Sequence, residues 1–418
     1  MSIEVKNSGL LVGLFLILSF ALHAKEIEIC PTCNVNSIQH ALDIAKDGDV
    51  LRLKKGIYKE GKLIILKQIS IIGEDYPILD GEFETEIISI QADNVVIKGL
   101  QIQNVGVSFM EDRAGVKIEE KEHCRIEDNR FINTFFAIYL AHSKNCLVKN
   151  NYIEGEAKEE ATSGNGVHLW YCDSILIEKN EITQHRDGIY IEFSGNSIII
   201  GNDSYNNIRY GLHFMFSDNN LYSENIFRNN NAGVAVMYSN DIIMTNNQFM
   251  DNWGSGCYGL LLKEIKDSRL TGNLIKKNTT GIYMEGSNRV VFEGNDLDQN
   301  GWAIKIRGNC ESNTFFKNNF NSNSFELGTN SKNNLENSFN NNYWSKYTGY
   351  DLDKDGYGDI SHNPINLFSY IVEKNPTSII LLRSLFIDIL DIAEKITPVI
   401  TPESMLDESP LMKPYDRN

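Results

Sequence analysis

A small residue recurs at a nearly constant interval through the middle of this 418-residue chain. Glycine or alanine precedes a short apolar alternation at nine positions, with steps of 22 to 29 residues between them. These positions are Gly115, Ala137, Gly166, Gly188, Gly211, Gly233, Gly259, Gly281 and Ala303. A repeat of this length cannot bury its apolar face alone, so successive repeats must stack to form a continuous core.

A second column has the same period. Asparagine is followed two residues later by an apolar residue at Asn129, Asn151, Asn180, Asn225, Asn247, Asn273, Asn295 and Asn318. Asparagine tolerates left-handed turns, and its amide can form a ladder along a stack of coils. Two columns in one register therefore predict that each coil turns at the same place.

The residues between the columns alternate like β-strands. After Gly233, Val234, Val236 and Tyr238 take one phase, while Ala235 and Met237 take the other. A period near 22 leaves room for three short strands and three turns in each coil. A helical solenoid is excluded because the repeat has no 3.6-residue period and β-branched residues dominate it. The sequence predicts an all-β fold, a right-handed parallel β-helix.

Five segments are expected along the chain. Residues 1–24, with Lys6 before an apolar run and Ala24 at its end, are typical of a secretory signal peptide. Residues 25–46 predict a strand and a capping helix, and residues 47–345 the β-helix. Residues 346–364 form an acidic segment, and residues 365–418 predict amphipathic helices and an extended arm. Those helices either cap the β-helix or contact a membrane protein.

The overall charge and the cysteines limit the function classes. The formal net charge of −17 disfavours a nucleic acid or a polyanionic sugar, but allows a cation or a basic protein partner. The seven cysteines do not form a disulfide framework. Cys30 and Cys33, in a CxxC motif, are expected to form a local disulfide in an oxidising compartment, with metal capture or redox work as alternatives.

Two insertions, at residues 154–164 and 251–257, interrupt the rhythm just before the glycine column. Both loops should leave the same corner, and they either form walls around a basin or are neutral variations in loop length. The outward positions between them are His168 and Trp170, Tyr190 and Glu192, His213 and Met215, and Ala235 and Met237.

Methionine is unusual at outward positions that hold lysine, glutamate or arginine in other coils. Imidazole and thioether ligands together suit copper, particularly Cu(I). His213, Met215 and Met237, with His168 further away, are therefore candidate copper ligands. A hydrophobic docking surface for a partner protein is the alternative interpretation.

A second group of charged residues lies beside these positions. Arg186 and Asp187 precede Gly188, Arg209 follows one coil later, and Glu192 lies on the intervening strand. Polysaccharide lyases and epimerases with this architecture use acidic residues, arginine and histidine for proton abstraction. The sequence lacks a dense acidic cluster, so a structural Arg–Asp pair and a non-enzymatic scaffold are favoured.

The acidic segment contains a partial calcium motif. Asp351, Asp353 and Asp355 hold positions 1, 3 and 5 of a calcium loop, Tyr357 position 7 and Asp359 position 9. The twelfth position is His362 rather than glutamate, so the loop is not a full EF-hand. The alternative is a solvated acidic turn.

Several segments together resemble the NosD family. These are GNGVHLWYCDSILIEKNEITQHRDGIYIEFS, RYGLHFMFSDNN and AGVAVMYSND in the repeats, and NNYWSKYTGYDLDKDGYGD and FSYIVEKNPTSIILLRSLFIDILD in the tail. The resemblance covers nearly the whole chain after the signal peptide.

The resemblance implies a periplasmic protein at the inner membrane, docked on an ABC transporter of permease and ATPase. It also implies a part in building the copper centre of nitrous oxide reductase, an enzyme of denitrification, with copper received from a lipoprotein chaperone. The copper ligands remain an inference from the spacing of the residues.

Overall fold

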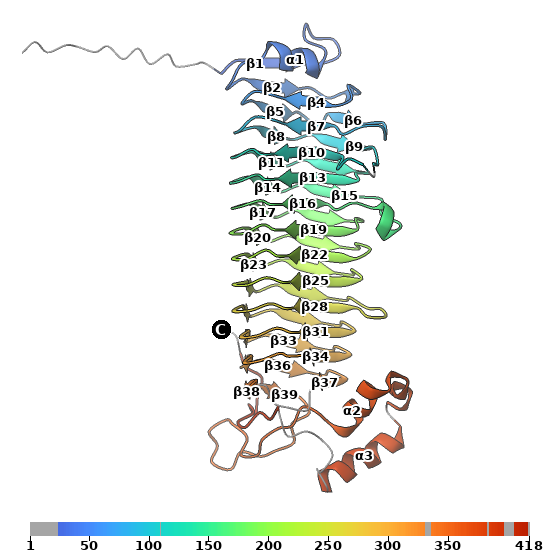
Figure 1. The fold of residues 1–418 in the computed structure, drawn as a ribbon, viewed down its shortest axis with the longest axis vertical. Coiled ribbons are helices and arrows are strands. Elements are labelled where there is room, and N and C mark those ends of the chain that lie inside the picture. The colour runs from blue at the N-terminus through green and yellow to red at the C-terminus, as the bar shows by residue number, and fades with distance from the viewer. Residues whose placement is uncertain (1–23, 109, 331–335, 383, 397–404, 417–418) are drawn as a thin grey trace, which may run out of the picture.

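The computed structural model describes residues 24–108, 110–330, 336–382, 384–396 and 405–416 (Figure 1). All but the last residue of the predicted signal peptide lie outside these ranges. The described chain forms a right-handed parallel β-solenoid with a strand of each of three sheets in most coils, which confirms the predicted fold. No helix among the described residues is both long and apolar enough to cross a membrane.

Each coil passes through sheets A, B and C in turn. Sheet A contains β1 (Glu26–Ile29), β2 (Val50–Leu53), β5 (Ser70–Gly73), β8 (Val96–Lys98), β11 (Arg125–Glu127), β14 (Leu147–Lys149), β17 (Leu176–Glu178), β20 (Ile198–Ile200), β23 (Leu221–Ser223), β26 (Ile243–Thr245), β29 (Arg269–Thr271), β32 (Val291–Glu293), β35 (Thr314–Phe316) and β38 (Ser338–Asn340). Sheet B contains β3 (Ile57–Tyr58), β6 (Ile78–Asp80), β9 (Gln101–Gln103), β12 (Arg130–Ile132), β15 (Tyr152–Glu154), β18 (Glu181–Thr183), β21 (Asp203–Tyr205), β24 (Ile226–Arg228), β27 (Gln248–Met250), β30 (Leu274–Lys276), β33 (Asp296–Asp298), β36 (Asn319–Asn321) and β39 (Tyr343–Trp344). Sheet C contains β4 (Leu63–Ile65), β7 (Ile88–Ile90), β10 (Ala114–Glu119), β13 (Phe136–Ala141), β16 (Val167–Trp170), β19 (Asp187–Glu192), β22 (Tyr210–Met215), β25 (Ala232–Met237), β28 (Tyr258–Lys263), β31 (Thr280–Glu285), β34 (Trp302–Arg307) and β37 (Phe325–Thr329).

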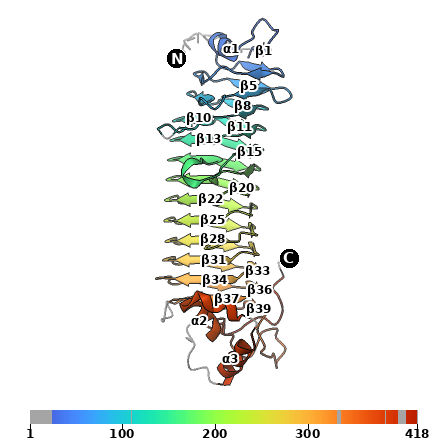
Figure 2. The same ribbon diagram turned by 90° about the vertical axis from the view of Figure 1, so that its right-hand side faces the viewer.

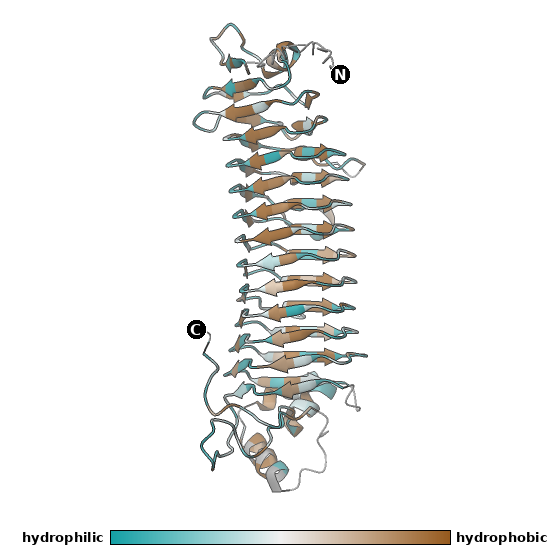
Figure 3. Ribbon diagram, turned by 90° about the vertical axis from the view of Figure 1, so that its left-hand side faces the viewer, coloured by the Kyte–Doolittle hydropathy of each residue, from teal (hydrophilic) through white to brown (hydrophobic). Residues whose placement is uncertain are grey.

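The glycine column lies at the start of the sheet C strands, where the backbones of neighbouring coils lie close together. A Cβ atom added to Gly233 would lie 2.4 Å from the carbonyl oxygen of Gly259 in the next coil. This contact explains why glycine or alanine occupies the column from Gly115 to Ala303; the two coils before it carry Lys62 and Ile87 instead. The apolar interior runs the length of the stack between the polar turns (Figure 3).

The asparagine column forms a buried ladder at the corner between sheets A and B. Asn225 is typical: its Nδ2 donates to the carbonyl of Ile199 (2.8 Å) and to Oδ1 of Asn247 (3.0 Å). Asn202 also belongs to this ladder, although the residue two places later is Ser204 rather than an apolar one. A second ladder, at the corner between sheets B and C, contains Asn207, Asn230, Asn252, Asn278, Asn300 and Asn323.

Both ends of the stack are covered. At the N-terminal end, α1 (Ile38–Ile44) buries Ile38 and Ala41 against the first coil, and the Ser37 side chain caps the helix. At the other end the arm returns to the last coil, where the buried Asp407 carboxylate accepts hydrogen bonds from Asn342 Nδ2 and Trp344 Nε1. The arm then runs back along the outside of the stack (Figure 2).

The C-terminal helices lie below the last coil (Figures 1 and 2). They are α2 (Leu367–Lys374), the 3-10 helix η2 (Pro376–Leu381) and α3 (Leu385–Ile396). Phe368 and Val372 of α2 and Ile387 of α3 form a small core with Trp302 and Phe325 of the solenoid. Their outer surface stays apolar and exposed, at Ile379, Ile380, Leu385, Phe386, Ile389 and Ile392.

Candidate functional site

Both insertions leave the corner between sheets B and C, the first carrying the short helix η1 (Glu160–Thr162). Between them, the strands β16, β19, β22 and β25 stack in register. One row of sheet C contains His168, Tyr190, His213 and Ala235, and the neighbouring row contains Trp170, Glu192, Met215 and Met237. The side chains of Met215 and Met237 therefore lie side by side on adjacent strands.

The first row is less accessible than its outward position suggests. His213 is 5% exposed and Tyr190 is 9% exposed, because aromatic rings cover this part of the sheet. The ring of His213 packs against Tyr190 and Tyr210, with centroids 5.1 and 4.8 Å away. Met215 and Met237 are only half-buried, so the thioethers form the more accessible part of the group.

His168 is separated from His213 by an intervening ring. Its imidazole lies between Tyr139 and Tyr190, with centroids 4.6 and 4.7 Å away. Burial lowers the pKa of His168 to about 3, so the ring is neutral at ordinary pH. The structure thus groups His213 with the two methionines and holds His168 in an aromatic column on the far side of Tyr190.

An ion pair between the buried Asp187 and the partly buried Arg209 lies next to His213. The carboxylate of Asp187 is fully buried and accepts two hydrogen bonds from Arg209, one from Nε at 2.8 Å and one from Nη2. Burial alone would raise the pKa of Asp187, but hydrogen bonds with His213 and Arg209 hold it below its ordinary value. Arg186 Nε lies 3.8 Å from the same carboxylate. The Asp187 carboxylate is therefore occupied by hydrogen bonds and ion pairs with its neighbours, and it does not face solvent.

His213 has one ring nitrogen engaged and one without a partner. Nδ1 lies 3.2 Å from Arg209 Nη2 and 3.6 Å from Asp187 Oδ2, while Nε2 is buried without a hydrogen bond. If Nδ1 accepts from Arg209, Nε2 carries the proton; if Nδ1 donates toward Asp187, the Nε2 lone pair is available. The second arrangement is the usual one for a metal-binding histidine supported by a carboxylate.

An exposed aromatic ladder borders the methionine row, and the sequence reasoning missed it. The five rings of His142, Tyr171, Phe193, Phe216 and Tyr238 stack with centroids 4.7–5.3 Å apart and planes within 18°. Tyr238 was expected to share the inward phase of Val236, which is wrong. Its φ of 53° turns the chain, so the ring lies outside on Phe216.

The ladder occupies a turn position that other coils fill with polar or small residues. All five aromatic residues have φ near 50°, where bulky side chains are uncommon. The same position holds Glu120 and Glu264 in the flanking coils, and Gly286 and Gly308 further along. The sequence contains a signal for this ladder, because an aromatic residue directly follows each of the outward positions Trp170, Glu192, Met215 and Met237.

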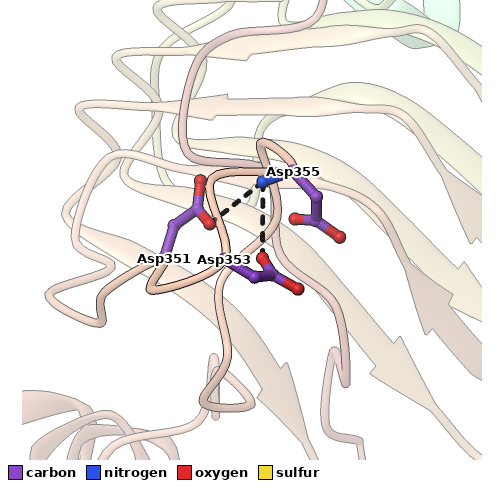
Figure 4. A group of neighbouring side chains, drawn as sticks. All are labelled: Asp351, Asp353 and Asp355. Atoms are coloured by element: carbon purple, nitrogen blue, oxygen red, sulfur yellow. Dashed lines mark hydrogen bonds between the residues drawn. The ribbon is translucent and has the colours of Figure 1, made fainter.

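Two further predicted groups lie away from this surface. Cys30 and Cys33 are joined by a disulfide near the N-terminal cap. In the acidic loop, Asp351, Asp353 and Asp355 bring ligand oxygens within 4.8 Å of one another (Figure 4). A hydrogen bond from Asp355 N lowers the pKa of Asp353, but repulsion from the Asp355 carboxylate, desolvation and the neighbouring Asp351 and Asp359 together raise it.

The comparisons with known proteins agree along most of the chain. The family described as "Periplasmic copper-binding protein (NosD)" matches residues 150–349, and "Right handed beta helix region" matches residues 85–187. A relative from Stutzerimonas stutzeri, named "Probable ABC transporter binding protein NosD", is 27% identical over 87% of this chain and 86% of its own. The protein of the same name from Pseudomonas aeruginosa is 28% identical over 89% and 90%.

Solved structures show the fold alone. The Dettilon tailspike protein superposes with a TM-score of 0.55 at 16% identity, covering 70% of this chain and 64% of its own. The pre-mature bacteriophage phi29 gene product 12 gives 0.61 at 10% identity, covering 74% and 50%. The Streptococcus pneumoniae adhesin PfbA gives 0.51 at 13% identity, covering 78% and 92%.

The substitution Asp187→Asn tests the buried ion pair. It should reduce the free energy of unfolding by about 3 kcal/mol, because Arg209 would remain partly buried without its counter-charge. The matched control is Asp203→Asn, which removes the half-exposed pair with Arg228 and should cost about 1 kcal/mol or less. Urea denaturation measures both, and equal losses would contradict the structural role of Asp187.

Proposed function

Because this chain is a NosD-like β-helix protein, we propose that it is a periplasmic, non-enzymatic subunit that handles copper for the maturation of nitrous oxide reductase. In this proposal it docks on an ABC transporter, receives copper from a lipoprotein chaperone and serves as a scaffold for the reductase. The name of the family supports the copper part, and the names of the two relatives support the transporter part.

The observation that carries the copper proposal is the group His213, Met215 and Met237. Two thioethers lie side by side on adjacent strands, and an imidazole lies two residues along the strand from Met215. The Nε2 atom of that imidazole has no partner, and Asp187 lies near its other nitrogen. Soft sulfur ligands with one imidazole favour Cu(I) over the harder divalent ions. Half-buried thioethers also suit a site that passes its metal on.

The same surface gives little support to carbohydrate catalysis, the alternative function. A general base must reach the proton that it removes. Asp187 is fully buried and is held by Arg209, while Arg186 Nε lies 3.8 Å from the same carboxylate. These groups suit support of the sheet better than proton transfer to a bound sugar.

Anaerobic Cu(I) titration tests the copper proposal. The mature chain should bind near-stoichiometric copper, and His213→Ala/Met215→Ala/Met237→Ala should lose most of that binding. Met250→Ala, on sheet B, is the matched thioether control and should bind like the native chain. The five free cysteines are present in every variant and are buried, so a difference between variants reports on the His/Met group. Equal copper binding by the triple variant and the native chain would overturn the assignment.

The aromatic ladder suits a protein partner that exchanges copper with the neighbouring methionines. Aromatic and methionine side chains are enriched at protein interfaces. Tyr171, Phe193 and Phe216 are 38–47% exposed, and Met215 and Met237 directly precede Phe216 and Tyr238. A chaperone or reductase bound to the ladder would thus stand beside the proposed copper ligands.

The double variant Phe193→Asn/Phe216→Asn tests this docking surface. Asparagine accepts a positive φ, so the turns should keep their shape and the melting temperature should stay close to that of the native chain. Binding of the purified chaperone domain or of apo nitrous oxide reductase should weaken at least tenfold, as expected for aromatic anchors. Glu264→Asn, in the same column outside the ladder, is the control. Unchanged affinity for both proteins would exclude the ladder as the docking surface.

The transporter is proposed to bind at the other functional region, the C-terminal helices. The exposed apolar side chains of η2 and α3, among them Ile380, Leu385 and Ile392, need an apolar partner. The membrane permease of the proposed transporter offers such a surface, and its ATPase would lie on the cytoplasmic side. The inner face of the same helices is already packed on the solenoid through Phe368 and Ile387.

The acidic loop is proposed to bind calcium as a structural ion. Asp351, Asp353 and Asp355 supply carboxylate oxygens, and Gly356 has the positive φ of 92° that the sharp turn requires. Millimolar Ca²⁺ should therefore raise the melting temperature of the native chain and leave that of Asp351→Asn/Asp355→Asn unchanged. An equal response of both proteins would identify the loop as a solvated turn.

A further inference from the structure

The last coil breaks the rule of the small-residue column. Phe325 pairs with Trp302 and Leu327 with Ile304, so Glu326 takes the place that Ala303 holds in the coil before. From Gly115 to Ala303 this position holds glycine or alanine, because a Cβ atom there meets the backbone of the next coil. No further coil covers Glu326, so steric freedom permits a larger residue at this position but does not require a buried charge.

Glu326 is 6% exposed, and its two carboxylate oxygens differ. Oε2 lies 2.8 Å from Nε2 of His362, whose ring is held against Trp344 and Tyr347. Oε1 is buried and has no hydrogen-bond partner. An uncompensated carboxylate oxygen in the interior is costly, so a cationic partner at this oxygen would be favourable.

This carboxylate lines a cavity of about 600 Å³ between the last coil and the C-terminal helices. Glu394 of α3 adds a second carboxylate to the wall, where it accepts the backbone N–H of Leu367. Lys346 also lines the cavity, and its ammonium group donates a hydrogen bond to the carbonyl of Ser324. The remaining wall includes the apolar Ile360 and Ile365.

We propose that this cavity binds an alkylammonium or alkylguanidinium group, with Glu326 Oε1 as its counter-charge. The volume falls within the roughly 300–1,000 Å³ of organic ligand sites, and the apolar walls suit an alkyl chain. A metal ion fits less well, because a metal site needs several converging ligands. Among the described residues, three such ligands converge in the separate loop at Asp351 and not in this cavity. The group can come from a free amine or from a lysine or arginine of a bound partner. The second source rests on the proposed docking of the transporter at this end.

Titration calorimetry with butylamine and butylguanidine on the mature chain tests the cavity directly, with pentanol as a neutral probe of similar size. Both cations should bind saturably and pentanol should not. Glu326→Gln should weaken the binding of both cations at least tenfold, because it keeps the shape and removes the charge. Glu311→Gln, which is exposed elsewhere, should have no effect.

A second variant keeps the test decisive if Glu326→Gln folds poorly. Ser361 lies on the cavity wall, so Ser361→Lys supplies a tethered ammonium group. It should raise the melting temperature and abolish the binding of both cationic probes. Undiminished binding in Ser361→Lys and Glu326→Gln, or equal binding of pentanol, would overturn the proposal, as would a native chain that binds neither cation.

The source of the group is decided with the purified transporter complex. Competition between butylguanidine and the transporter, with weaker transporter binding in Glu326→Gln, identifies a side chain of the partner. Probe binding that persists in the assembled complex identifies a free amine. A transporter that fails to bind the native chain counts against the proposed function, while the calorimetry still decides the cavity.

Discussion

The hydrogen-bonded asparagine ladders are the constraint on which the rest of this structure depends. A coil of about 22 residues must turn three times, and each turn places polar backbone groups near the apolar interior. The Asn225 side-chain amide donates both to the carbonyl of Ile199 in the preceding coil and to Oδ1 of Asn247 in the next coil. Because each rung takes its partner from the next coil, an insertion must leave the rungs aligned, and Asn252, at the start of the second insertion, still donates to Asn278. Both insertions accordingly lie in the corner loops, and the register of the strands on either side is preserved.

The same logic explains how the stack ends. The final rung, Asn342, has no following asparagine, and the Asp407 carboxylate takes its place. Asp407 comes from the arm, 65 residues further along the chain, and it also accepts from Trp344. The arm is therefore part of the solenoid's hydrogen bonding. Its return to the last coil is also what brings His362, which pairs with the Asp407 backbone, over Glu326.

The sequence predicted the features that follow from repetition. Two columns with one period fixed the class of fold, and the register that they imply placed Met215 beside Met237. The burial of His213 could not be predicted, because it depends on the rings of Tyr190 and Tyr210. The aromatic ladder was missed because strict alternation was extended through Tyr238, whereas its left-handed backbone ends the strand one residue earlier. Alternation describes strands, and it gives no warning of where a turn begins.

Departures from a column carry more functional information here than the columns themselves. Stacking makes each position of a coil nearly equivalent to the same position in the next, so a change of residue type needs a local cause. Met215 and Met237 replace charged side chains, five rings replace glutamate or glycine, and Glu326 replaces alanine. The first two changes fall in neighbouring positions of the same coils, which is expected if one partner covers both. The third falls where stacking ends, at the end that also exposes the apolar helices. A solenoid of this kind can therefore separate two binding surfaces along one rigid axis, with the proposed copper ligands near the middle and the proposed transporter contact at the tip.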